Sequence, residues 1–179
     1  MIVPIKPFSK AKRRLSSVLS DEERISLVHE MAERVIAAAH PMPVIVACED
    51  VEVANWAEGL GATAFLTDAN GLSAAVSNAV SHAGSIGIEE VTVAHGDLPH
   101  ATGLAQLPEF DGVTLVPDRS FDGTTVIRIQ TSLPFEFSYG PGSFRRHKIE
   151  SKRLGVATLV LTPESLRFDV DTPEDLKWV

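Results

Sequence analysis

Residues 44–66 read VIVACEDVEVANWAEGLGATAFL, and this stretch decides the fold class. The apolar run Val44–Cys48 predicts a buried strand, and residues 51–58 follow with apolar side chains at helical spacing until two glycines interrupt them. A second β-rich run, Thr63–Leu66, completes a strand–helix–strand unit. Because such units place helices between parallel strands, this one predicts an α/β fold.

The same alternation continues on both sides of this unit. Ser20 with Glu23 predicts a capping box at the start of a helix. Further strands are expected at residues 2–5, 91–94, around 115, 126–129 and 157–161, and further helices at 25–39, 72–83, 143–154 and from Thr172 onward. The strand runs are nearly continuous in apolar residues, which is typical of strands covered on both faces. We therefore predict one domain, residues 1–179, with a mainly parallel sheet and flanking helices. Residues 121–141 interrupt the pattern, and we expect an extra hairpin or a lid there.

Composition and charge limit the partners that this chain can have. The 179 residues carry 24 Asp and Glu against 16 Lys and Arg, a net charge of -8. An acidic surface repels a phosphate backbone, so we expect no nucleic-acid partner. No apolar run approaches the roughly 20 residues of a membrane span, so we expect no membrane partner either. The single cysteine, Cys48, cannot form a disulfide within the chain, which favours a cytoplasmic setting.

Three aspartates follow predicted strands. Asp97 lies in HGDLPH, after the strand at 91–94, and Asp169 and Asp171 lie in FDVDTPEDL, before the last helix. Side chains two residues apart in an extended chain face the same side, so Asp169 and Asp171 can enter one cleft. Carboxylates at strand ends suit Mg²⁺ that is shared with substrate phosphates. The alternative is that Asp171 only caps the last helix and that Asp97 caps a turn.

A basic segment follows the first predicted strand. PIKPFSKAKRRL, residues 4–15, contains five cations: Lys6, Lys10, Lys12, Arg13 and Arg14. In a strand-to-helix loop, cations and backbone N–H groups can bind a triphosphate. The segment has neither the P-loop pattern nor the glycine fingerprint of dinucleotide sites. A solvated charged face is the alternative.

Two glycine-bearing loops complete the candidate site. DGTT, residues 122–125, contains Thr124 and Thr125, and YGPGSF, residues 139–144, contains Gly140, Gly142 and Ser143. Glycine lets the backbone approach a ligand closely, and a hydroxyl at a helix start can bind an anion. Arg145, Arg146 and His147 add positive charge after the second loop. An ordinary turn with Ser143 as the helix N-cap is the alternative.

Taken in order, these segments resemble the 2-phospho-L-lactate and phosphoenolpyruvate guanylyltransferases of coenzyme F-420 biosynthesis. The resemblance runs nearly from end to end. It is carried by VPIKPFSKAKRRL, LSDEER, the Gly71–Leu72 turn, GDLP, the DGT loop, GPGSF followed by RRH, and DVDTPEDL. It implies a glycosyltransferase-A-like fold and an Mg²⁺-dependent reaction, in which the phosphate of the acid attacks the α-phosphorus of GTP and pyrophosphate leaves.

The resemblance also implies a role for each matching residue. The metal ligands are Asp97, Asp169 and Asp171. The residues that bind the small phosphorylated carboxylic acid are Lys6, Thr124 or Thr125, Gly140 and Ser143. The nucleotide is expected to contact the Gly71–Leu72 turn and, in the basic segment, Lys10, Lys12 and Arg14. We expect Asp97, Lys6 and Lys12 to carry the catalysis.

Five positions depart from the family pattern: Ser73, His95, Gly96, Asp122 and Thr125. A carboxylate at Asp122, near a phosphate site, would either weaken binding or recruit a metal. Phosphoenolpyruvate and 2-phospho-L-lactate differ only in saturation at one carbon, so the residues leave both acceptors open. Two other functions stay open as well: a nucleotidyltransferase for 3-phosphoglycerate or another phosphorylated acceptor, and a non-catalytic nucleotide-binding paralogue. The three aspartates favour an enzyme.

Overall fold

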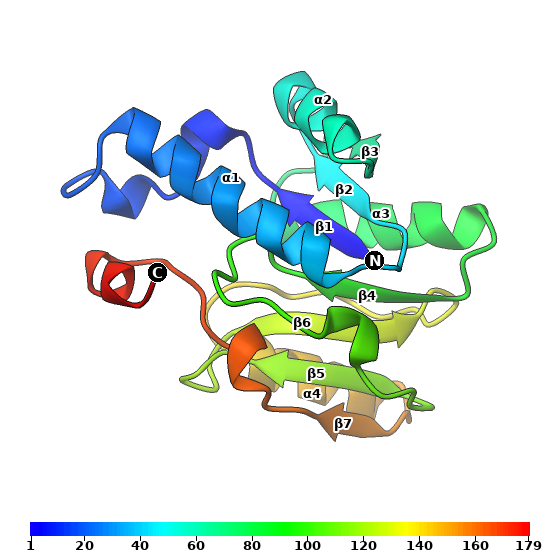
Figure 1. Cartoon of the computed structure of the whole chain (residues 1–179). Coiled ribbons are helices and arrows are strands. Elements are labelled where there is room, and N and C mark those ends of the chain that lie inside the picture. The colour runs from blue at the N-terminus through cyan, green and yellow to red at the C-terminus, as the bar shows by residue number, and fades with distance from the viewer.

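The computed structural model describes residues 1–179 as one seven-stranded sheet with helices on both faces (Figure 1). The strands are β1 Ile2–Ile5, β2 Ile45–Cys48, β3 Thr63–Leu66, β4 Glu90–Ala94, β5 Val113–Pro117, β6 Thr124–Gln130 and β7 Thr158–Val160. The α-helices are α1 Asp21–Ala38, α2 Val51–Gly59, α3 Leu72–Ser85 and α4 Ser143–Arg153. Short 3₁₀ helices lie at Phe8–Lys10, Arg13–Leu15, Leu104–Gln106, Glu164–Leu166 and Pro173–Trp178. All the predicted strands are present.

The sheet is mainly parallel, as the sequence predicts. Its strand order is β3-β2-β1-β4-β6-β5-β7, and only β6 runs antiparallel to its neighbours, β4 and β5. Of the two alternatives expected for residues 121–141, a hairpin or a lid, the structure shows the hairpin. The segment does contribute to a hairpin, formed by β5 and β6, but Thr124–Gln130 lies inside the sheet and is no lid. The buried side chains of Val126, Ile127 and Ile129 explain why this strand is central.

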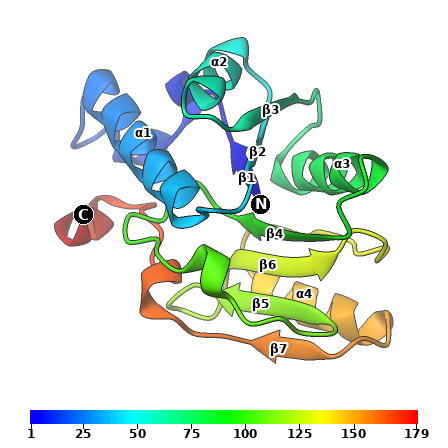
Figure 2. The same cartoon turned by 45° about the vertical axis from the view of Figure 1, so that its right-hand side comes forward.

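Two helical layers cover the sheet, with α1 and α2 on one face and α3 and α4 on the other (Figure 2). Alternate residues of β2 face opposite layers: Val46 and Cys48 belong to the core under α1 and α2, whereas Ile45 and Ala47 belong to the core under α3. Because successive side chains of a strand point to opposite faces, a strand between two layers must be apolar throughout. None of the helices combines the length and the apolar character that crossing a membrane requires.

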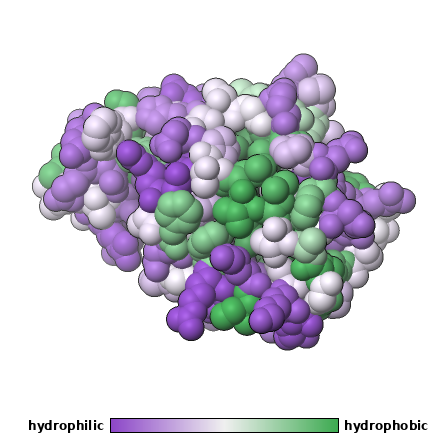
Figure 3. All heavy atoms as spheres, turned by 90° about the horizontal axis from the view of Figure 1, so that it is seen from below, coloured by the Kyte–Doolittle hydropathy of each residue, from purple (hydrophilic) through white to green (hydrophobic).

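The two edge strands are covered less completely than the sequence pattern suggests. The residues of β3 and β7 are half-buried or exposed, and Leu66 and Val160 are among the exposed apolar side chains. Figure 3 shows the molecule from below, the side on which β7 lies in Figure 1, and apolar atoms gather there within a polar rim. The prediction that strands are covered on both faces therefore holds only for the five inner strands.

The predicted capping box begins α1. The Ser20 hydroxyl accepts a hydrogen bond from the Glu23 N–H at 3.2 Å, and the Glu23 carboxylate accepts one from the Ser20 N–H at 2.8 Å. The last helix does start after Thr172 with a proline, but it is a 3₁₀ helix and not an α-helix. Its own capping box, formed by Thr172 and Asp175, satisfies the N–H groups at its start.

We expect Ser20→Ala to lower the free energy of unfolding by about 1 kcal/mol, because it leaves an N–H group at the start of α1 without its partner. Urea denaturation followed by circular dichroism measures the change. Ser17→Ala is the matched control, because Ser17 is exposed and precedes the helix, and its effect should stay within about 0.5 kcal/mol. Equal effects of the two substitutions would show that the cap contributes nothing.

Candidate active site

One large pocket opens at the edge of the sheet where β1, β2 and β4 end. Its volume is about 680 Å³, and its lining includes Lys6 after β1, Glu49 after β2 and His95 after β4. Because β6 runs in the opposite direction, its first residue, Thr124, lies at this same edge. Ligands of open α/β sheets bind beyond the carboxyl ends of the parallel strands. The pocket is therefore the candidate active site.

All the site residues that the sequence analysis proposed line this pocket. They are Lys6, Lys10, Lys12, Arg14, Gly71, Leu72, Asp97, Thr124, Thr125, Gly140, Ser143, Asp169 and Asp171. They come from segments that are distant along the chain, so only the fold brings them together. Because all of them share this location, the hydrogen bonds and ion pairs of each residue are needed to infer its role.

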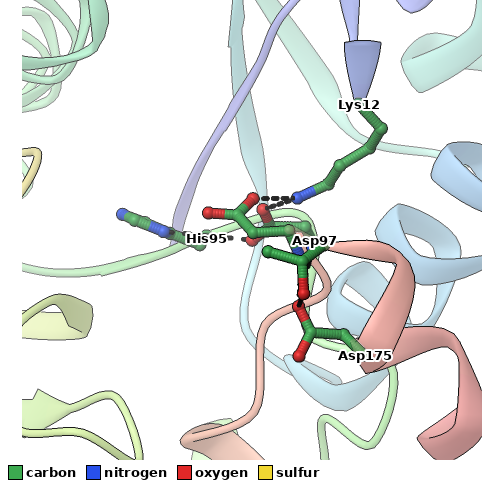
Figure 4. Close-up of polar contacts among 6 residues, drawn as sticks. Lys12, His95, Asp97 and Asp175 are labelled. Carbon is green, nitrogen blue, oxygen red and sulfur yellow. Dashed lines mark hydrogen bonds and ion pairs between the residues drawn. The ribbon is translucent and has the colours of Figure 1, made fainter. Parts of the chain in front are cut away.

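The Lys12 ammonium lies against two of the three aspartates (Figure 4). Its Nζ donates to Asp97 Oδ2 and, at 2.9 Å, to Asp171 Oδ1. The Lys12 side chain is only 9% exposed. Its backbone is left-handed, with φ 50° and ψ 37°, a conformation that a residue other than glycine keeps only when its surroundings hold it. The two ion pairs are such surroundings.

The three aspartates of the site differ in their electrostatic surroundings. Burial disfavours the ionised form of Asp97, but the Lys12 ammonium outweighs burial and holds the pKa of Asp97 below its usual value. Burial also opposes the charge of Lys12, and the two aspartates raise the pKa of Lys12 above its usual value nevertheless. Asp169 has no such partner. Burial, followed by the charges of Asp97 and Asp171, raises the pKa of Asp169 to about 7.

The aspartates fit a divalent cation by their chemistry, although the side chains are not arranged around one. No group of three or more His, Cys, Asp or Glu side chains surrounds a common metal position. However, Asp97 Oδ1 is buried without a hydrogen-bond partner, and burial together with the charges of Asp97 and Asp171 raises the pKa of Asp169, so a bound cation would favour its ionised form. Carboxylate oxygens are the ligands that Mg²⁺ prefers. The residues present therefore fit Mg²⁺.

Asp171 is not the cap of the last helix, which was the alternative to a metal role. Thr172 is the N-cap of that helix, and the Asp175 carboxylate inside its first turn accepts hydrogen bonds from the N–H groups of Thr172, at 2.7 Å, and Asp171, at 3.0 Å. The Asp171 carboxylate is 53% exposed and contacts only Lys12. Between the two aspartates, Val170 is fully buried in the core. This alternation turns Asp169 and Asp171 toward the pocket, as predicted.

The two threonines of the DGTT loop have different partners. The Thr125 hydroxyl donates to the Leu166 carbonyl oxygen at 2.6 Å, so it ties β6 to the segment that leads to Asp169. The Thr124 oxygen lies 3.5 Å from the Ser143 hydroxyl and makes no hydrogen bond to a backbone carbonyl. Thr124 is therefore the threonine whose hydroxyl can serve a ligand, while Thr125 is committed to the fold.

The loop before α4 is shaped by its neighbours and not by Ser143. Gly142, with φ 73°, is the N-cap of α4, so the alternative in which the Ser143 side chain caps the helix is wrong. Asp122 Oδ2 accepts a hydrogen bond from the Gly142 N–H at 2.9 Å. Arg146 donates to carbonyl oxygens of residues 138–141. Asp122, one of the departures from the family pattern, thus holds the loop, and the Ser143 hydroxyl contacts Thr124 Oγ1 and not the end of the helix.

The residues predicted to bind the nucleotide all precede β4 in the chain and line the pocket. Gly71, with φ 93°, is the N-cap of α3. No side chain caps this helix, so no side chain accepts a hydrogen bond from its first N–H groups. Ser73 Oγ, another departure from the family pattern, accepts a hydrogen bond from the Tyr139 N–H at 2.9 Å and so joins α3 to the loop before α4. Lys10 and Arg14 are exposed at the pocket.

His95 is a pocket residue to which the sequence analysis gave no role. Figure 4 shows it on the side of Asp97 away from Lys12, with 3.9 Å between His95 Nδ1 and Asp97 Oδ1. Its Nε2 is buried and has no partner. Burial lowers the pKa of His95, so the neutral ring is favoured. The sequence signal that could have identified His95 as a pocket residue was its position directly after β4 and two residues before Asp97.

Comparisons with known sequences agree with this site. The model of the family described as "Guanylyl transferase CofC like" matches residues 1–179. A phosphoenolpyruvate guanylyltransferase from Sphaerobacter thermophilus is 32% identical over 98% of this chain and 89% of its own length. A 2-phospho-L-lactate guanylyltransferase from Methanocaldococcus jannaschii is 27% identical over 98% of this chain and 80% of its own length.

Solved structures support the fold. A protein from Desulfovibrio desulfuricans, described as a nucleotide-diphospho-sugar transferase, has a TM-score of 0.74 at 14% identity, over 98% of this chain and 83% of that one. A cytidylyltransferase from Leptospira borgpetersenii has a TM-score of 0.63 at 15% identity, over 98% and 82%. Because the family match spans the whole chain, this protein belongs to the CofC-like guanylyl transferases.

Proposed function

We propose that this chain transfers GMP from GTP to the phosphate of phosphoenolpyruvate or 2-phospho-L-lactate, in the biosynthesis of coenzyme F-420. One observation carries the proposal: a single pocket gathers the basic segment, the three aspartates and the two glycine-bearing loops. Relatives with both substrate names cover nearly the whole chain. Residues 1–179 act in this proposal as one nucleotidyltransferase domain in the cytoplasm.

The reaction needs charge neutralisation and alignment more than a protein base. A phosphate oxygen of the acid forms a bond to the α-phosphorus of GTP, and the bond between that phosphorus and the β-phosphate oxygen breaks to release pyrophosphate. The attacking phosphate is already anionic near neutral pH. Lys10, Lys12 and Arg14 bind the triphosphate, and Lys12 stabilises the negative charge at the phosphates. Mg²⁺, held by Asp97, Asp169 and Asp171, supplies further charge neutralisation when bound.

The acceptor side of the pocket holds the small acid. Lys6 pairs with one of its anionic groups, and the backbone at Gly140 together with the Ser143 and Thr124 hydroxyls binds another. Thr124 is favoured over Thr125 for this role because the Thr125 hydroxyl donates to Leu166. Phosphoenolpyruvate is the first acceptor to test, since the relatives named for it are 29–33% identical and those named for 2-phospho-L-lactate are 26–28% identical.

We expect pyrophosphate release in the presence of Mg²⁺, GTP and one of the two acids, and none when the acid is omitted. The assay compares GTP with ATP, and each acid with 3-phosphoglycerate. Mass spectrometry of the guanylylated product identifies the acceptor. Release only with 3-phosphoglycerate would replace the proposed acceptor, and no release with any pair, from folded protein that binds GTP, would favour a non-catalytic nucleotide-binding protein.

Asp97→Asn and Asp171→Asn should each lower kcat/KM at least about 100-fold, because each removes an anionic ligand of the proposed metal. Calorimetric titration with Mn²⁺ and GTP should show weaker metal binding in both variants. Asp68→Asn is the control, since Asp68 is exposed and lies outside the pocket. Wild-type rates and metal affinity in either site variant would remove that aspartate from the metal site.

Lys6→Ala should raise the KM for the acid about 10- to 100-fold and leave the KM for GTP nearly unchanged. A hydrogen bond from a charged donor to an anion contributes about 1.5–3 kcal/mol, which corresponds to that range. Lys152→Ala serves as the control, because Lys152 is an exposed cation outside this pocket. An increase confined to the KM for GTP would place Lys6 on the nucleotide side instead.

A further inference from the structure

His147 is a fully buried polar residue for which the proposed chemistry has no use so far. Its exposure is 0%, and the rings of Phe135, Phe137 and Tyr139 surround it. The sequence analysis counted His147 as added positive charge, and this is wrong: burial lowers the pKa of His147 to about 4, so the ring is neutral. Buried polar atoms are normally hydrogen-bonded, so the partners of the two ring nitrogens define its role.

The backbone fixes which nitrogen of His147 carries the proton. The Ser138 N–H donates to Nε2 at 3.0 Å, and a backbone N–H can only donate. Nε2 is therefore the unprotonated nitrogen, and the proton of the neutral ring lies on Nδ1. Nδ1 is 3.0 Å from Thr124 Oγ1, so His147 donates to the Thr124 hydroxyl oxygen. Thr124 is thereby an acceptor toward His147, and its own proton must point elsewhere.

The Thr124 oxygen accepts from His147 and from the Ser143 hydroxyl, so the Thr124 proton itself has no acceptor within the protein. Thr124 Oγ1 has no other hydrogen-bond partner than His147 and the Ser143 hydroxyl, 3.5 Å away. Two hydroxyl groups carry two protons, and only one proton can lie between two oxygens. At least one proton is therefore unused by the protein. An anionic oxygen placed near both hydroxyls could accept from Thr124 and Ser143 together.

We propose that His147 is a positioning residue that directs the Thr124 hydroxyl proton into the acceptor side of the pocket, toward an anionic oxygen of the phosphorylated acid. The inference rests on the proposed function for the identity of that acid. The hydrogen-bond chain runs from the Ser138 N–H through the His147 ring to Thr124, so the backbone of the loop before α4 orients the hydroxyl. Arg146 holds the carbonyl groups of the same loop, which keeps the Ser138 N–H in place.

Two substitutions at His147 separate this role from simple packing. In His147→Asn the side-chain amide can occupy the position of Nδ1 and still donate to Thr124, whereas in His147→Gln the amide reaches the position of Nε2 and keeps only the Ser138 contact. We expect the KM for the acid to be about three- to ten-fold higher in His147→Gln than in His147→Asn, the range for one neutral hydrogen bond. The KM for GTP should be the same in both variants.

A double-mutant cycle tests whether the effect passes through Thr124. In a Thr124→Val background, His147→Gln and His147→Asn should have equal KM values for the acid, because no hydroxyl remains to be oriented. An unchanged difference between them in that background would overturn the proposal. So would equal KM values of His147→Gln and His147→Asn in the presence of Thr124, since packing alone would then explain both.

Nitrogen-15 NMR of the wild-type protein tests the tautomer without any variant, and so remains informative if His147→Gln does not fold. At pH 7 the His147 ring should be neutral with its proton on Nδ1. A proton on Nε2, or a charged ring, would overturn the proposal. Calorimetric titration of the variants with phosphoenolpyruvate in the absence of nucleotide measures acid binding directly. A difference in acid affinity between the Asn and Gln variants would support the positioning role even if guanylyl transfer itself were disproved.

Discussion

The ion pairs of Lys12 join three parts of the chain that are distant in sequence. Lys12 lies in the basic segment after β1, Asp97 follows β4, and Asp171 precedes the last helix. Removing one partner from a buried ion pair costs about 3–5 kcal/mol, because the remaining charge stays desolvated. Asp171 is half-exposed, so its share is smaller than that of Asp97. These ion pairs stabilise the shape of the pocket, because separating the segments would leave the Asp97 carboxylate without the Lys12 ammonium.

The antiparallel strand β6 has a comparable effect on the acceptor side. A parallel strand in its place would put the residues of the DGTT loop at the far edge of the sheet, away from Asp97. Because β6 runs antiparallel to β4, Thr124 and Thr125 lie beside the carboxyl end of β4. Consecutive strand residues point in opposite directions. Thr125 therefore bonds to Leu166 while Thr124 lies near Ser143.

Much of the fold could be predicted from the sequence because its signals are local. The apolar run Val44–Cys48 and the Ser20 capping box each depend on neighbouring residues only, and both are confirmed. The position of β6 depends on pairing with β4, and the paired residues Glu90 and Gln130 lie 40 residues apart in the chain, so no local pattern encodes this contact. The sequence could not predict that the last helix is a 3₁₀ helix, because a capping residue followed by proline is found at the start of both helix types.

The candidate site divides in the same way. Hydrophilic residues directly after apolar strands, such as Asp97, could be found from the sequence, and all the proposed residues line the pocket. The partners of those residues could not be found. The contact of Asp122 with Gly142 crosses between two loops, and the charge state of His147 depends on aromatic side chains that surround it only in the folded chain. His147, which the sequence suggests to be a positive charge, is therefore neutral in the folded protein.

Charge balance links the two halves of the pocket. The chain is acidic overall, yet both proposed substrates are anions, so the basic segment must offset repulsion from the aspartates. One ammonium cannot neutralise two carboxylates and a triphosphate at once. If Lys12 turns toward the phosphates, Asp97 and Asp171 lose their only cation and join Asp169 in needing one. Binding of a divalent cation and binding of nucleotide should therefore favour each other, and the coupling is reciprocal by linkage.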